Sequence, residues 1–171
     1  FGWRRYPYST DLTKNPVTLR DIDPAQFIVR PGIPVHASPD KTADEFHNIG
    51  EIWCSALWEV RANLIQKQGF HPGNWLALQL VTDGMRLCPN SPNFLDARDA
   101  ILQADLVASG GENHPEIWAG FAKRGMGVNA TSPPSKTTVG VLESFDMPDL
   151  LIIEPRAGTT WTTRGPAAGP F

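Results

Sequence analysis

The feature that most constrains the fold is a long apolar stripe between residues 43 and 68. Its members recur every three or four positions, as they do along one face of an α-helix: Phe46, Ile49, Trp53, Leu57, Val60 and Leu64. Thr42 and Glu45 have the spacing of a capping box at its start, and Gly69 follows its end. Ile52 and Ala56 widen the stripe. We therefore expect a helix over about residues 43–68 that is covered on more than one side.

Shorter helical patterns follow this stripe. Pro92 suits the first turn of a helix, and Asn113 with Glu116 repeats the capping spacing. No stretch in this region alternates with a period of two, so strands are not expected there. We predict a mainly α-helical body with further helices over about residues 75–87, 91–110 and 113–125.

Proline and glycine crowd the two ends of the chain. Six prolines within residues 1–41 predict an extended, turn-rich segment whose order depends on packing against a neighbouring part of the protein. Thr, Ser and Pro are frequent after residue 130, which favours a linker over residues 131–148. The run Leu150–Ile153 is of β type, so we expect residues 149–171 to form a tail or the start of a following β domain that is cut off here. Residues 1–130 are then the helical lobe.

Length, charge and cysteine content exclude several classes of protein. The chain has 171 residues, about one domain, and 15 Lys and Arg against 18 Asp and Glu leave a net charge of −3. Nucleic acid and an anionic membrane are therefore not expected partners, because both are bound by clustered basic residues. The apolar runs are too short to cross a bilayer, which takes about 20 residues. Two cysteines, Cys54 and Cys88, do not make a disulfide scaffold, and whether they pair stays open.

The chain lacks the usual motifs of hydrolytic catalysis. A self-contained zinc hydrolase most often carries HExxH, but no two of the four histidines stand three or four residues apart. His47 and Glu51 share a helix face and would hold a metal only with a third ligand; such a pair is more often a surface pair or an ordinary hydrogen bond. GxSxG and a phosphate loop are also absent. From the residues alone, the chain is a helical domain.

Several motifs, in order and spacing, resemble the C-terminal half of the fungalysin-type zinc metallopeptidases, family M36. They are RRYPYST at 4–10, FHNIGEIWCSALWEVRANLI at 46–65, LVTDGM at 80–85, NFLDARDAILQAD at 93–105, GGEN at 110–113 and IWAGFAKRGMGVNA at 117–130. The resemblance covers about residues 1–130. It implies a thermolysin-like enzyme in which a zinc-bearing lobe and a helical C-terminal lobe face each other across the substrate cleft.

The resemblance also implies where the metal lies. In the family, the HExxH helix and the downstream glutamate ligand precede the segment present here. We therefore expect zinc in the complete enzyme, bound by an absent N-terminal lobe that is this chain's partner, and no metal in this chain. Without HExxH, the chain alone is expected to be inactive.

Two site residues carry over from the family. His47, in the FHNIG motif, matches the histidine that donates a hydrogen bond to the developing oxyanion; because a helix N-terminus disfavours extra positive charge, a neutral ring is expected there. Arg4 matches an arginine that contacts a substrate carbonyl, although Arg5 is an alternative. Tyr6 and Tyr8 either line the cleft or anchor the extended segment.

The resulting prediction is the C-terminal lobe of a secreted zinc metalloendopeptidase that acts on peptides or proteins. In this prediction the chain forms one wall of the cleft and stabilises the oxyanion through His47. The alternative is a noncatalytic helical module that associates with another chain, because a lobe shaped to face a partner leaves an apolar patch when it is isolated.

Overall fold

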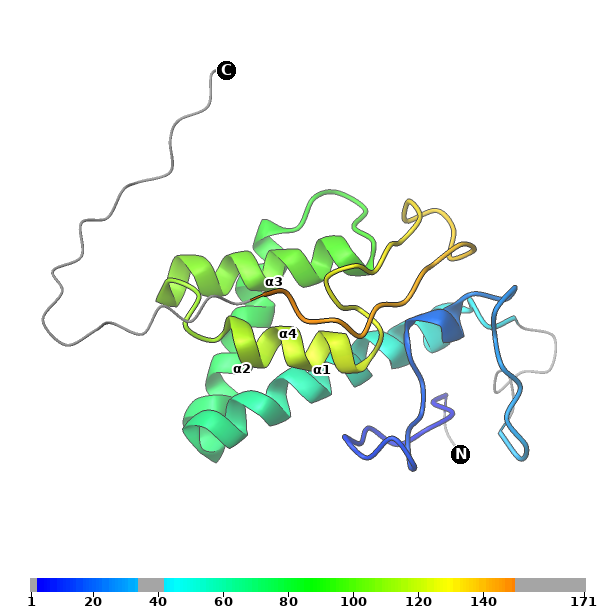
Figure 1. Cartoon of the computed structure of the whole chain (residues 1–171), viewed down its shortest axis with the longest axis horizontal. Coiled ribbons are helices and arrows are strands. Elements are labelled where there is room, and N and C mark those ends of the chain that lie inside the picture. The colour runs from blue at the N-terminus through cyan, green and yellow to red at the C-terminus, as the bar shows by residue number, and fades with distance from the viewer. Residues whose placement is uncertain (1–2, 34–41, 150–171) are drawn as a thin grey trace, which may run out of the picture.

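The structure, a computed structural model, describes residues 3–33 and 42–149. Within these residues, four α-helices follow a short 3-10 helix (Figure 1). The elements are η1 (Leu19–Ile22), α1 (Phe46–Gln68), α2 (Phe70–Leu87), α3 (Phe94–Ser109) and α4 (His114–Lys123). The same residues contain two isolated β-bridges and no named strand. The prediction of a mainly α-helical fold is therefore confirmed.

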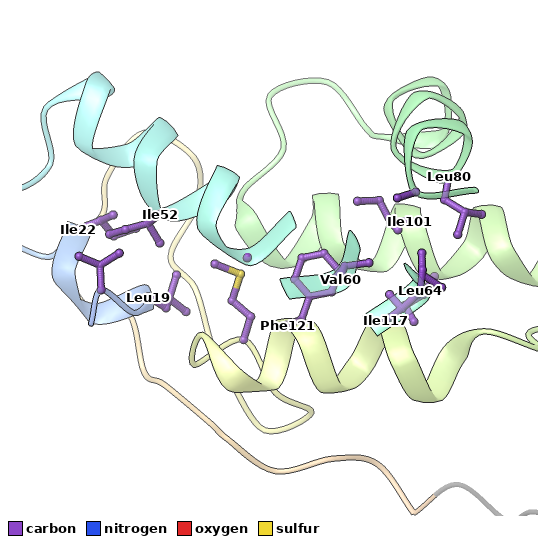
Figure 2. Close-up of a cluster of buried hydrophobic side chains, with 14 of the residues drawn as sticks. Leu19, Ile22, Ile52, Val60, Leu64, Leu80, Ile101, Ile117 and Phe121 are labelled. Carbon is purple, nitrogen blue, oxygen red and sulfur yellow. The ribbon is translucent and has the colours of Figure 1, made fainter. Parts of the chain in front are cut away.

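Helix α1 is the centre of the packing. It contacts α2, α4 and η1, and α3 packs against α2 and α4. Figure 2 shows core side chains from η1 and all four helices, and each of the labelled ones is at most 2% exposed: Leu19, Ile22, Ile52, Val60, Leu64, Leu80, Ile101, Ile117 and Phe121. Burying one such side chain stabilises the fold by about 1.5–3 kcal/mol. The expectation that α1 is covered on more than one side is confirmed.

The start of α1 differs from the prediction. The helix begins at Phe46 rather than at residue 43, because Glu45 is the N-cap and its carboxylate accepts a hydrogen bond from the backbone N–H of His47. The hydroxyl of Thr42 instead donates to the side chain of Asp44. A carboxylate at this position also suits the positive end of the helix dipole.

Local backbone geometry explains the other shifted boundaries. Helix α2 begins at residue 70 rather than 75, because Gly69 (φ 88°) alone separates it from α1 and Pro72 is tolerated in a first turn. Helix α3 begins at residue 94 rather than 91, because Asn93 caps two N–H groups of the first turn, whereas Ser91 has a φ of 55°. Asn113 makes no side-chain cap; its amide donates to a buried carboxylate of α3.

The two flanking segments pack against each other and against the helices. Gly140 donates its N–H to Asp23, and Gln26 donates to the carbonyl of Val141, which is fully buried. Part of the segment expected to be a linker therefore covers the N-terminal segment. The division into lobe, linker and tail stays a prediction. The β-type run Leu150–Ile153 lies outside the described residues.

Candidate functional site

The RRYPYST segment lies against the first turns of α1 through a buried ion pair. The Nε atom of Arg5 donates to Oε2 of Glu51 at 2.7 Å. Oε1 of Glu51 accepts the backbone N–H groups of Arg5 at 2.6 Å and of Tyr6 at 2.9 Å. Arg5 and Glu51 are both buried. Glu51 therefore anchors the extended segment, and Arg5 has a structural role.

This arrangement decides how Glu51 is used. Both of its carboxylate oxygens accept hydrogen bonds from the N-terminal segment, so it is not set up to bind a metal together with His47. Among the residues that the structure describes, no three His, Cys, Asp or Glu side chains are placed to hold a metal ion. This part of the chain therefore does not fit a zinc site. Cys54 and Cys88 do not form a disulfide with each other.

His47 lies in the first turn of α1 with its ring held on several sides. Its Nδ1 atom is 3.0 and 3.1 Å from the two carboxylate oxygens of Glu45. The indole of Trp3 stacks on the imidazole, with 4.6 Å between ring centroids and 14° between planes, and the ring of Phe46 is also close. A carboxylate beside Nδ1 makes that nitrogen the donor to Glu45, so Nε2 is the nitrogen at the opposite edge of the ring. The side chain is 25% exposed rather than enclosed in the core.

Arg4 lies directly beside His47. One of its terminal nitrogens, Nη1, donates to the backbone carbonyl of His47, and its Nε donates to the hydroxyl of Tyr8 at 3.0 Å. The guanidinium packs over Gly50, where a Cβ atom would be 3.4 Å from Nη2. Arg4 is partly exposed, in contrast to the buried Arg5. Of the two arginines, Arg4 is therefore the one that a ligand beside His47 can reach.

The surface next to this pair is hollowed and apolar. A cavity of about 310 Å³ is lined by Phe46, Gly50 and Trp53 of α1 and by Phe94 at the start of α3. Phe46 belongs to the apolar stripe seen in the sequence, yet it is 71% exposed. The apolar face of α1 is thus buried in its middle and open at its start, beside His47 and Arg4.

Two residues around His47 were not singled out by sequence reasoning. The capping-box spacing predicts Thr42, not His47, as the partner of Glu45, and Trp3 lies outside the motifs. An acidic residue two positions before a histidine in a first helical turn was the available signal for Glu45. No local signal pointed to Trp3, because its contact with His47 joins residues 44 positions apart.

Tyr8 is fixed between Arg4 and α1. Its ring stacks on Trp58, with 6.1 Å between centroids. Burial raises the pKa of Tyr8, and a hydrogen bond and charge interaction with Cys54 raise it further, while Arg4 lowers it by less. A tyrosine whose pKa lies above the ordinary value near 10 stays neutral at physiological pH, so its oxygen can accept the Nε–H of Arg4.

Comparison with known proteins identifies the family. The sequence model of the fungalysin metallopeptidase (M36) family matches residues 1–130. Extracellular metalloproteinase 1 of Trichophyton equinum is 42% identical over 150 residues, which cover 80% of this chain and 22% of the relative. Extracellular metalloproteinase MEP of Fusarium vanettenii is 39% identical over 161 residues, 86% of this chain and 22% of the relative.

A third relative, the extracellular metalloproteinase mep of Aspergillus fumigatus, is 41% identical over 155 residues, which cover 83% of this chain and 22% of its own length. The chain thus spans about a fifth of the length of the curated relatives it matches. Because the family match covers residues 1–130, most of the chain, the chain belongs to the fungalysin (M36) metallopeptidase family.

Proposed function

We propose that the chain is the helical lobe of a secreted zinc metalloendopeptidase, forming one wall of the substrate cleft. The observation that carries the proposal is the placement of His47. Its ring contacts the carboxylate of Glu45 and stacks on Trp3, next to a hollow in the surface. Arg4 donates a hydrogen bond to its backbone carbonyl. A histidine that served only the core would be enclosed rather than 25% exposed beside a cavity.

In this proposal His47 acts through Nε2. The donor aims at the carbonyl oxygen of the scissile peptide bond and strengthens its hydrogen bond as negative charge develops there. A hydrogen-bond donor preplaced in this way raises kcat about 10²–10³-fold. Because Nδ1 already donates to Glu45, donation from Nε2 requires the protonated ring. The carboxylate of Glu45 then offsets the cost of a cation at a helix N-terminus.

Arg4 is proposed to contact a carbonyl oxygen of the substrate on the same wall. The N–H donors of its planar guanidinium point in fixed directions, which suits a carbonyl oxygen held in one position. The zinc implied by the family is bound, in this proposal, by an upstream lobe of the same protein, because the described residues offer no site for it. Secretion is proposed from the relatives, which are named extracellular metalloproteinases. Among the described helices, none has the length and apolarity needed to cross a bilayer.

The test is His47→Ala in the complete enzyme. We expect kcat to fall about 10²–10³-fold, the size found when one oxyanion donor is removed. Zinc content and KM should stay near the wild-type values. His71→Ala is the matched control, since His71 lies exposed on α2, and it should leave kcat unchanged. Wild-type turnover in His47→Ala would refute the assigned role.

The alternative, a noncatalytic module that binds another chain, is favoured by the outer face of α2. Trp75, Leu78 and Met85 are 71%, 53% and 65% exposed, and their spacing puts them on one side of the helix. Mass analysis of the protein purified from its source separates the two functions. A polypeptide containing HExxH, either continuous with this chain or bound to it, supports the peptidase. A lone folded chain without peptidase activity supports the module.

A further inference from the structure

The N-terminal segment contributes more than Arg4 to the surface beside His47. Arg4 is a long side chain on a segment without regular structure, so its guanidinium would ordinarily sample many rotamers, and ordering a side chain of this length costs up to about 2 kcal/mol. The structure shows three contacts that limit this freedom. They involve Tyr8, Gly50 and the carbonyl of His47.

We propose that Tyr8 is a positioning residue that holds the Arg4 guanidinium in place for the substrate. The inference rests on the proposed function of this surface as a cleft wall. Tyr8 accepts the Nε–H of Arg4, while the His47 carbonyl accepts from Nη1. Two acceptors on two different nitrogens fix both the position and the rotation of the planar group. Within the described residues Nη2 makes no hydrogen bond, so it is the nitrogen left for a carbonyl oxygen of the substrate.

Tyr8 is itself held by α1, which is rigid and central. Its ring stacks on Trp58, with 6.1 Å between the ring centroids. The guanidinium of Arg61 in turn lies over the ring of Trp58, 4.8 Å from its centroid. The support therefore runs from α1 through Trp58 and Tyr8 to Arg4. Burial keeps the pKa of Tyr8 above its ordinary value, so the acceptor stays a neutral phenol across the neutral pH range.

Gly50 provides the floor of this arrangement. A Cβ atom at Gly50 would lie 3.4 to 3.8 Å from the guanidinium atoms of Arg4, which is ordinary contact distance. A side chain larger than a methyl group would therefore lift Arg4 away from α1. In this arrangement Tyr8 anchors the N-terminal segment to α1 through its contact with Trp58.

The first experiment uses this chain by itself and does not depend on activity. Tyr8→Phe keeps the ring that stacks on Trp58 and removes only the hydroxyl. In nuclear magnetic resonance spectra, we expect the Nε–H of Arg4 to exchange slowly with water in the wild type and at least tenfold faster in Tyr8→Phe. Arg4→Lys assigns the resonance. An Nε–H that exchanges equally fast in the wild type and Tyr8→Phe would overturn the proposal.

The second experiment measures peptide hydrolysis by the complete enzyme. We expect Tyr8→Phe to raise KM about tenfold with kcat changed less than threefold, which is a different signature from the kcat loss expected for His47→Ala. Adding Tyr8→Phe to Arg4→Ala should cause no further loss, because the two residues act as one unit. Tyr6 is buried in the hydrophobic core rather than exposed beside Arg4. Tyr6→Phe is therefore the matched control in the same segment, and its kinetics should equal those of the wild type. Additive losses in the double variant would show that Tyr8 does not act through Arg4.

The two experiments separate failure of this inference from failure of the proposed function. If Arg4→Ala leaves KM unchanged, the substrate role of Arg4 is wrong, and Tyr8 then has nothing to position. If Arg4→Ala raises KM while Tyr8→Phe does not, the proposed function stands and the role of Tyr8 is wrong.

Discussion

Replacing Arg124 with methionine is expected to remove a large part of the stability of this lobe. Arg124 follows α4 and is fully buried. Its Nε and Nη2 donate to Oε1 of Glu59 at 3.0 and 2.6 Å. Its terminal nitrogens also donate to the backbone carbonyls of Asn15 at 2.7 Å, Val17 at 2.9 Å and Ser9 at 2.6 Å. One side chain thus joins α1, the end of α4 and the extended N-terminal segment.

The magnitude follows from what Arg124→Met leaves behind. Breaking a buried ion pair by removing one partner costs about 3–5 kcal/mol. Lys123 keeps its 2.9 Å contact with Oε2 of Glu59, which favours the lower end of this range, but three carbonyls lose a charged donor. We therefore expect a loss near 4 kcal/mol, a large share of the roughly 5–15 kcal/mol that a domain has. At an m-value of about 2 kcal/mol per M, the urea midpoint falls by about 2 M.

The assay is urea unfolding followed by circular dichroism. Arg20→Met is the control, because Arg20 makes a looser and more exposed pair, with 3.6 Å between its Nε and Oε2 of Glu143. That variant should lose less than about 1 kcal/mol. If Arg124→Met also loses less than about 1 kcal/mol at an unchanged m-value, the argument that Arg124 ties the N-terminal segment to the helices is refuted.

Two further predictions concern packing and pH. Gly120→Ala should destabilise the lobe by about 1–3 kcal/mol, because its Cβ would lie 2.6 Å from the backbone nitrogen of Val60 where α4 crosses α1. Gly50→Ala is the control in α1, because a Cβ atom there has ordinary contact distances. It should raise the free energy of unfolding by up to about 1 kcal/mol through helix propensity. Equal losses of stability in both variants would contradict this interpretation of the packing. Burial by itself would raise the pKa of Asp23. The hydrogen bonds that its carboxylate accepts, of which the one from the N–H of Gly140 has the largest effect, outweigh burial and leave the pKa below its ordinary value. A carboxylate with a lowered pKa stabilises the fold above its unfolded pKa near 4 and loses that contribution as the pH falls through the folded value. Urea midpoints should therefore fall below about pH 4, and less steeply in Asp23→Asn; identical profiles would contradict the prediction.

The helical body could be predicted because helix formation leaves a local pattern. The spacing of Ile52, Val60 and Leu64 identified α1, and the expected end at Gly69 was found. The starts of the helices were less accurate, because several side chains within one turn can serve as the cap. Glu45 caps α1 in place of Thr42, and Asn93 caps α3 in place of Ser91; only the folded backbone chooses between such neighbours.

The candidate site was located from motifs rather than from periodicity. Family motifs pointed to His47 and Arg4, and the structure places these two side by side, while their roles in catalysis stay predictions. The choice between Arg4 and Arg5 required the structure, because adjacent residues in an extended segment point to opposite sides. Arg5 turns inward to Glu51, and Arg4 turns to the surface.

The sequence by itself determined that this chain is mainly helical, that it belongs to a metallopeptidase family, and that its residues lack the familiar zinc-binding motif. These properties depend on periodicity and on short motifs, which are local. The tertiary structure decided which polar residues serve the fold and which face a ligand. Glu51, Glu59 and Arg124 look in the sequence like solvated charges, yet they are buried partners of segments up to 115 positions away. The physical reason is that a buried charge requires a partner, and that partner is selected by the path of the chain in space rather than by its neighbours in sequence.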